Sequence, residues 1–156
     1  MKERVYLDST IPSYYFEERD NLHLFADITR DWWESMANEY ELYISEEVLR
    51  EVSMGEYPNR SKVVQFTSQV PILSSDPGIA STADFYIQNK VMPNSLIGDA
   101  FHLAYASYYG LEYLLTWNCN HLANANKKKH IRVINARMGL TTPEIVTPLE
   151  LFKEKD

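Results

Sequence analysis

Three acidic residues and one amide stand where predicted strands and helices of this 156-residue sequence meet. Asp8 ends a short β-rich run, and Asn118 follows a later run of the same kind. Glu51 lies two turns into one helical stretch, and Asp99 lies in the first turn of another. Apolar or small residues surround Asp99, and a carboxylate in such surroundings is expected to have a partner. Because parallel sheets bind ligands at the carboxyl ends of their strands, these four residues can converge on one edge, although each alone is also typical of a surface residue or a helix cap.

Hydrophobic periodicity predicts the elements that must position these residues. Between residues 21 and 38, apolar side chains recur every four positions from Leu24 to Met36, as in an amphipathic helix. Pro71 lies inside a β-rich run, so we expect this strand at an edge of the sheet. Strands are predicted at residues 4–8, 42–44, 70–73, 113–116 and 145–147. Helices are predicted at residues 21–38, 45–55, 61–69, 79–90, 96–109 and 122–138.

Polar residues predict where the helices that carry Glu51 and Asp99 begin. Ser45 is a natural N-cap for the first of these helices, because its hydroxyl can accept a hydrogen bond from a free backbone N–H. Asn94 or Ser95 is expected to cap the second helix in the same way.

The order of the elements predicts the fold class. Residues 122–138 contain a β-rich run at 131–134, but the spacing of their apolar residues and the glycine that follows favour a helix. Strands and helices therefore alternate along the chain. This alternation predicts an α/β sandwich with a mostly parallel sheet, because right-handed crossovers place helices on both faces.

Composition places the sequence among ordinary globular proteins. Hydrophobic residues make up 45% and charged residues 24%, which argues against a disordered chain or a fibrous repeat. The length fits one domain, residues 1–156. No apolar run approaches the ~20 residues that span a bilayer, and no signal-peptide pattern is visible, so we expect a cytoplasmic protein with no membrane partner. The single cysteine, Cys119, excludes an internal disulfide and is expected to pack.

Charge is unevenly distributed along the sequence. The net charge of -7 argues against a protein that coats nucleic acid through a basic surface. Between Glu112 and Glu144, however, the sequence contains five basic residues and no acid. The run Lys127, Lys128 and Lys129 in this stretch is either a solvated helix face or a patch that contacts RNA phosphates.

Five segments form an ordered set that spans nearly the whole chain. They are Val5 to Thr10, Ile44 to Val52, Asp99 to Ala104, Leu114 to Asn118, and Pro143 to Pro148. This set resembles the PIN domain family, the fold of the VapC-type toxin ribonucleases. The resemblance implies a three-layer α/β/α fold with strand order 3-2-1-4-5 and an acidic pocket that holds Mg²⁺ or Mn²⁺ for RNA cleavage. It assigns the metal-ligand role to three carboxylates and a supporting role to two hydroxyls. These residues are Asp8, Glu51 and Asp99, and Thr10 and Thr116.

The sequence departs from this family at Asn118, where many members carry a fourth acid. An amide oxygen ligates a hard cation but adds no charge to offset the desolvation of a dication, so we expect a weaker site or a single ion. The loss keeps open an alternative, a non-catalytic PIN-like module that binds protein or RNA. The segment from Asp8 to Thr10 also matches part of the haloacid-dehalogenase motif, but Thr10 stands where a second Asp is expected.

The sequence therefore predicts a Mg²⁺- or Mn²⁺-dependent endoribonuclease that acts as the toxin of a type II toxin–antitoxin pair. RNA is the predicted substrate, and an antitoxin protein and a second copy of the chain are candidate partners. The predicted catalytic set is Asp8, Glu51, Asp99 and Asn118. The four histidines lack the spacing of metal ligands and are expected in the packing or at the surface: His23, His102, His121 and His130. Contact with substrate is an alternative for His121, because it lies near Asn118 in the sequence.

Overall fold

The computed structural model describes residues 1–118, 120–122 and 124–152. Within these residues, four parallel strands form one sheet in the order β2-β1-β3-β4. Val5 lies in the central strand and pairs with Leu42 on one side and Tyr113 on the other. Residues 5–7 of this strand are buried, because helices cover both faces of the sheet. The strands are β1 (Glu3–Leu7), β2 (Tyr40–Tyr43), β3 (Tyr113–Leu115) and β4 (Glu144–Val146).

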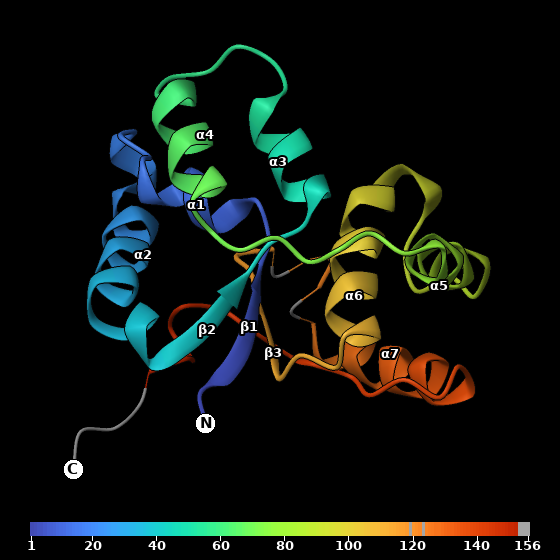
Figure 1. Cartoon of the computed structure of the whole chain (residues 1–156). Coiled ribbons are helices and arrows are strands. Elements are labelled where there is room, and N and C mark those ends of the chain that lie inside the picture. Colours follow the sequence, from blue (N-terminus) through green and yellow to red (C-terminus); the bar gives the residue numbers. More distant parts are fainter. Residues whose placement is uncertain (119, 123, 153–156) are drawn as a thin grey trace.

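Helices form the outer layers. The α-helices are α1 (Thr10–Tyr15), α2 (His23–Met36), α3 (Glu46–Ser53), α4 (Arg60–Ser68), α5 (Pro77–Gln88), α6 (Ile97–Tyr108) and α7 (Ala125–Arg137), and the 3₁₀ turns are η1 (Asp20–Leu22), η2 (Ala37–Glu39) and η3 (Asn94–Leu96). Figure 1 shows α1 and α2 on one side of the sheet and α5, α6 and α7 on the other. Asn135 of α7 joins this second layer, because it accepts a hydrogen bond from Tyr86 of α5 and donates one to Ser107 of α6. The expected α/β/α class is confirmed.

The predicted strand at 70–73 is reduced to a single bridge. Ile72 bridges Ile44 in parallel orientation, just beyond the end of β2. The Ile44 N–H donates to the Pro71 carbonyl at 3.0 Å, and the Leu73 N–H donates to the Ile44 carbonyl at 2.8 Å. Pro71 has no N–H to donate, so the ladder does not extend. The segment does lie at the predicted edge, and the remaining order of the sheet agrees with the prediction.

One of the two predicted helix caps is confirmed in position, and the other is wrong. Ser45 occupies the N-cap position of α3, but its side chain caps no backbone N–H and hydrogen-bonds the Tyr6 hydroxyl instead. Asn94 and Ser95 lie in η3, and no side chain caps the start of α6. By contrast, the helix predicted at 122–138 is confirmed as α7, which Asn124 caps through its side chain.

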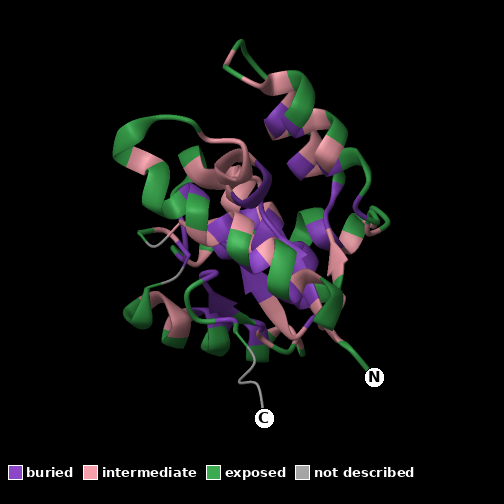
Figure 2. Cartoon of the chain, turned by 90° about the vertical axis from the view of Figure 1, so that its left-hand side faces the viewer, coloured by how far each residue is buried: buried purple, intermediate pink, exposed green. Residues whose placement is uncertain are grey.

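The buried residues gather in the sheet and on the helix faces that turn toward it, as Figure 2 shows. Trp32 of α2 is fully buried, and its indole N–H donates to the Leu151 carbonyl at 2.7 Å. This bond ties the segment after β4 to the α2 layer. In the described part of the chain, no helix has the length and apolar character needed to cross a membrane. Cys119, which is expected to pack, lies outside the described residues.

Candidate functional site

Asp8 is a buried carboxylate at the carboxyl end of the central strand, where it is only 2% exposed. Its Oδ1 accepts hydrogen bonds from the Thr10 N–H at 3.0 Å and from the Thr10 hydroxyl, and its Oδ2 accepts one from the Thr116 hydroxyl. Burial raises the pKa of Asp8 to about 6, although the charge of His102 and these hydrogen bonds act to lower it. The structure thus brings both predicted threonines to this carboxylate.

The same two threonines connect the ends of β1 and β3. The Thr10 hydroxyl oxygen accepts the Trp117 N–H at 3.0 Å, and the Thr116 hydroxyl oxygen accepts the Asn118 N–H at 2.9 Å. Each hydroxyl therefore donates to Asp8 while it accepts from the loop after β3. This arrangement fixes the carboxylate and the loop relative to each other.

Asn118 lies beside Asp99, the acidic residue in the first turn of α6. Its side-chain N–H donates to Asp99 Oδ2 at 3.1 Å, and its side-chain oxygen accepts the His121 N–H at 3.1 Å. Because the His121 N–H can only donate, the side-chain oxygen of Asn118 must face His121, and the side-chain NH₂ group of Asn118 then faces Asp99. Burial raises the pKa of Asp99, and the negative charge of Glu51 adds to this rise. Asn118 thus acts here as a hydrogen-bond donor to a carboxylate.

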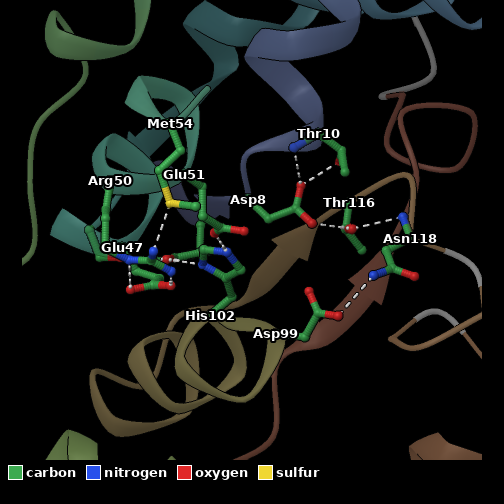
Figure 3. Close-up of polar contacts among 12 residues, drawn as sticks. Asp8, Thr10, Glu47, Arg50, Glu51, Met54, Asp99, His102, Thr116 and Asn118 are labelled. Carbon is green, nitrogen blue, oxygen red and sulfur yellow. Dashed lines mark hydrogen bonds and ion pairs between the residues drawn. The ribbon is translucent and has the colours of Figure 1, made fainter. Parts of the chain in front are cut away.

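Glu51 of α3 hydrogen-bonds His102 of α6, as Figure 3 shows. His102 is 1% exposed, and its Nδ1 lies 2.7 Å from the Tyr6 hydroxyl. Burial lowers the pKa of His102, but the Glu51 hydrogen bond and the surrounding carboxylates raise it to a net value above the ordinary one. The sequence interpretation missed this role. Its one sequence signal is the spacing of three residues from Asp99, which places both side chains on one helix face.

Three carboxylates from separate elements surround one space in Figure 3: Asp8 after β1, Glu51 on α3 and Asp99 on α6. Among the described residues, no three His, Cys, Asp or Glu side chains lie close enough together to hold a metal ion as they stand. Glu51 instead directs one oxygen to His102. The donor chemistry nevertheless fits Mg²⁺ or Mn²⁺, because every donor is an oxygen and no Lys or Arg in the described residues pairs with Asp8 or Asp99.

A cavity of about 710 Å³ adjoins this site on the side of Glu51. Its wall is formed by α1, the segment before η1, the end of α3, the segment between α3 and α4, and α4. The wall combines acidic and apolar side chains, with one cation that pairs with Glu17. Residues that give it this character are Phe16, Glu17, Glu18, Arg19, Met54 and Tyr57.

The three predicted RNA contacts lie on α7. Lys127 and Lys128 are half-buried and Lys129 is exposed. In the described residues, no ion pair or side-chain hydrogen bond joins them to the carboxylates. Lys128 and Arg132 instead line a small hollow of about 80 Å³ with residues 142–145. The structure therefore gathers the acidic set and its hydroxyls in one site, and the lysines stay a separate prediction.

Comparisons with known proteins agree with this architecture. The fold resembles a toxin–antitoxin complex from Klebsiella pneumoniae with a TM-score of 0.61 at 20% identity, over 92% of this chain and 97% of that chain. It also resembles VapBC2 from Rickettsia felis, solved with a DNA fragment from its promoter, with a TM-score of 0.58 at 20% identity, over 92% of this chain and 98% of that chain. No curated protein matches the sequence. Residues 5–128 match the model of the PIN domain, and the chain therefore belongs to the PIN domain family.

Proposed function

We propose that this protein is a Mg²⁺- or Mn²⁺-dependent endoribonuclease that cleaves RNA phosphodiester bonds. The observation that supports the proposal most is the gathering of Asp8, Glu51 and Asp99 from three separate elements at one end of a parallel sheet. Asp8 is buried, and no Lys or Arg in the described residues pairs with it. Such a carboxylate is costly, so it indicates a site that binds a cation. Membership of the PIN domain family supports the same activity.

The proposed roles follow from the contacts of each side chain. Asp8, Glu51 and Asp99 are the proposed ligands, and a bound Mg²⁺ or Mn²⁺ would activate water and stabilise the leaving oxygen. Thr10 and Thr116 hold the Asp8 carboxylate in one orientation by donating to its two oxygens. The backbone of the loop after β3 in turn fixes both hydroxyls.

Asn118 orients Asp99 by donating to its Oδ2, so Oδ1 stays available to a ligand. An amide adds no negative charge at the position where many PIN domains carry an acid. We therefore expect one ion in the absence of RNA, because more oxygen ligands arrive only with the substrate phosphate.

We propose that the protein acts in the cytoplasm as a VapC-type toxin with an antitoxin partner. Two toxin–antitoxin complexes that share the fold over 92% of this chain support this assignment. The cavity beside Glu51 has a net acidic and partly apolar wall, which suits a partner segment with basic and apolar side chains. A second copy of the chain remains a further predicted partner.

The alternative function is a PIN-like module that binds RNA or protein without cleaving it. Two observations favour it: Asn118 replaces an acid, and Glu51 pairs with His102. On this alternative, the carboxylates serve only to connect the elements that they join.

Cleavage of a mixed RNA pool by the purified protein tests the choice. We expect cleavage that rises with Mn²⁺, stops with a chelator and is lost in Asp8→Asn. Asp84→Asn is the matched control, because Asp84 is an exposed carboxylate on α5. The control should cleave like the wild type. RNA binding without Mn²⁺-dependent cleavage would support the non-catalytic module, and equal cleavage by Asp8→Asn would point to a contaminating nuclease.

A further inference from the structure

A continuous chain of hydrogen bonds runs through the core to Glu51. Ser45 Oγ lies 2.7 Å from the Tyr6 hydroxyl, which lies 2.7 Å from His102 Nδ1, and His102 Nε2 contacts Glu51 Oε1. Ser45, Tyr6 and His102 are each at most 1% exposed. The four residues come from β1, the start of α3, α3 itself and α6, so the chain connects three elements of the site.

The His102 ring is held on more than one side. Its Nδ1 is fixed by Tyr6, and the two rings pack with centroids 5.6 Å apart. The Tyr6 ring in turn stacks on Tyr105, one turn further along α6, at 6.3 Å. The imidazole orientation is thus set by packing and by hydrogen bonding before any ligand reaches Glu51, and such pre-organisation removes an entropy cost from binding.

The hydrogen bond that His102 Nε2 donates to Glu51 is the same in both protonation states of the ring, although the two hydroxyls change roles. When the ring is neutral, Ser45 donates to Tyr6, Tyr6 donates to Nδ1, and Nε2–H donates to Glu51. When the ring is charged, both ring nitrogens donate, and the Tyr6 and Ser45 hydroxyls reverse their roles. In either state the N–H of Nε2 points at Glu51 Oε1.

Glu51 needs such support more than Asp8 does. Its side chain is long and 29% exposed, whereas Asp8 is buried and bound by two threonines. Among the described residues, His102 is the one hydrogen-bond partner of the Glu51 carboxylate, and it occupies Oε1. Oε2 therefore stays available, and it lies close to Gly98 beside Asp99.

We infer that His102 is a positioning residue that fixes Glu51 through Oε1, so that Oε2 is presented to the metal ion beside Asp99. The inference rests on the proposed function, because it takes Glu51 as a metal ligand. Two other roles predict different outcomes: a His102 that competes with the metal for Glu51 would weaken metal binding, and a His102 that only fills space would not affect it.

Calorimetric titration of Mn²⁺ into the metal-free full chain separates these roles. His102→Met removes the donor while it retains an apolar side chain, and we expect a weakening of Mn²⁺ affinity by about 10- to 100-fold, the usual effect of losing a hydrogen bond to a metal ligand. His102→Gln keeps an N–H near the position of Nε2 and should restore most of the affinity. Ser107→Ala is the control, because Ser107 is a buried hydrogen-bonding residue on the same helix that contacts Asn135.

Several results would overturn the inference. Unchanged or tighter Mn²⁺ binding by His102→Met would assign His102 to space filling or to competition. A His102→Gln variant as weak as His102→Met would assign the loss to packing, and so would an equal loss in Ser107→Ala. RNA cleavage is measured on the same samples. Wild-type protein that binds Mn²⁺ through this arrangement but leaves RNA intact would refute the proposed ribonuclease and leave the positioning role standing.

A second measurement needs no variant and therefore covers the case in which His102→Met does not fold. Nitrogen-15 NMR of histidine-labelled wild type should show a slowly exchanging Nε2–H that persists and shifts when Mg²⁺ is added. An Nε2–H that is absent, or one that does not respond to saturating Mg²⁺, would overturn the inference.

Discussion

Asp8 shows at the scale of one residue what this site costs the protein. A carboxylate that is 2% exposed loses most of its hydration, and its pKa rises to about 6 even though three hydrogen bonds and His102 oppose the rise. The metal-free fold is therefore less stable with Asp8 ionised than with Asp8 protonated. Such a cost is typical of a residue that is retained for binding.

The first prediction is that Asp8→Asn stabilises the metal-free protein. Because the folded pKa of about 6 lies above that of the unfolded chain, the folded state binds more protons and stability falls as pH rises toward 6. Above pH 6 the full cost is present, at most about 3 kcal/mol. Urea unfolding at pH 7.5 in chelator should show a gain for Asp8→Asn that shrinks toward pH 4. A loss of stability at pH 7.5 would mean that the hydrogen bonds of the carboxylate outweigh its burial.

The second prediction concerns Asp99. Asp99→Asn removes one negative charge from the proposed metal site, so Mn²⁺ affinity should fall by about tenfold or more. Calorimetry measures it, with the exposed carboxylate variant Asp84→Asn as the control for general loss of charge. Equal affinity for the wild type and Asp99→Asn would remove Asp99 from the site.

The third prediction concerns Asn118. Asn118→Asp adds a fourth carboxylate about 3 Å from Asp99, so it should tighten Mn²⁺ binding and lower the Mg²⁺ concentration needed for activity. The same substitution should destabilise the metal-free fold, because it replaces an N–H donor by a like charge. Thermal unfolding without Mn²⁺ measures the loss of stability, and the rise in unfolding temperature on addition of Mn²⁺ measures the tighter binding. If neither quantity moves, Asn118 has no influence on the site.

At the scale of elements, Gly98 sets how closely α6 approaches α3. A Cβ at this position would lie 3.3 Å from Glu47 Oε1 and 3.5 Å from Glu51 Oε2. The fourth prediction is that Gly98→Ala weakens Mn²⁺ binding, because the new methyl group is tight against Glu47, which lies on the same face of α3 as Glu51. The better helix propensity of Ala, worth up to about 1 kcal/mol, should raise stability. The Mn²⁺ affinity measured by calorimetry should fall, while the unfolding temperature measured in chelator should rise. A parallel loss of both would indicate a general disruption of α6.

Sequence patterns predicted the elements better than their polar contacts. Apolar periodicity follows directly from burial, so helix α7 agreed with prediction. The order of the four strands agreed with the order that the resemblance to the PIN domain family implied. The segment at 70–73 did not form a regular strand, because Pro71 cannot donate to a ladder. Ser45 fitted a cap by type and position, but Tyr6, 39 residues away, took its hydroxyl.

The acidic set was predictable because parallel strands end at one edge. The role of His102 was not, since its partners Glu51 and Tyr6 lie 51 and 96 residues away along the chain. The spacing from Asp99 places His102 on the helix face of the site, but it does not identify the residues that His102 contacts on other elements. The hydrogen-bond partners of a buried polar side chain are determined by how whole elements pack. The sequence therefore predicts that such a side chain has a partner, but not which residue it is.

At the scale of the whole molecule, the charges are separated along the chain. The net charge is -7, yet residues 113–143 contain five basic residues and no acid. Screening at physiological ionic strength limits charge effects to roughly 8 Å, so a phosphate group responds to local charge more than to the total. An acidic protein can therefore bind RNA along one basic surface, and exposed or half-buried lysines on α7 are the candidates for it.

The fifth prediction is that replacing Lys127, Lys128 and Lys129 together by Gln weakens RNA binding across sequences. Each lost phosphate contact removes about 0.7 counterions for a single strand, so the slope of log K against log salt should flatten by about 2 if all three make contact. Mn²⁺ affinity should stay nearly constant, because no ion pair joins these lysines to the carboxylates in the described residues. Binding is measured in an Asp8→Asn background, which separates it from cleavage.

A second triple variant distinguishes local charge from total charge. Lys2, Lys62 and Lys90 are exposed lysines outside α7, and their replacement by Gln changes the net charge by the same amount. If RNA follows the α7 surface, only the Lys127, Lys128 and Lys129 variant flattens the salt slope. Equal flattening in both variants would assign the effect to net charge. An unaltered slope in the α7 variant would mean that these lysines form a solvated helix face, and RNA would then have to reach the carboxylates by another surface.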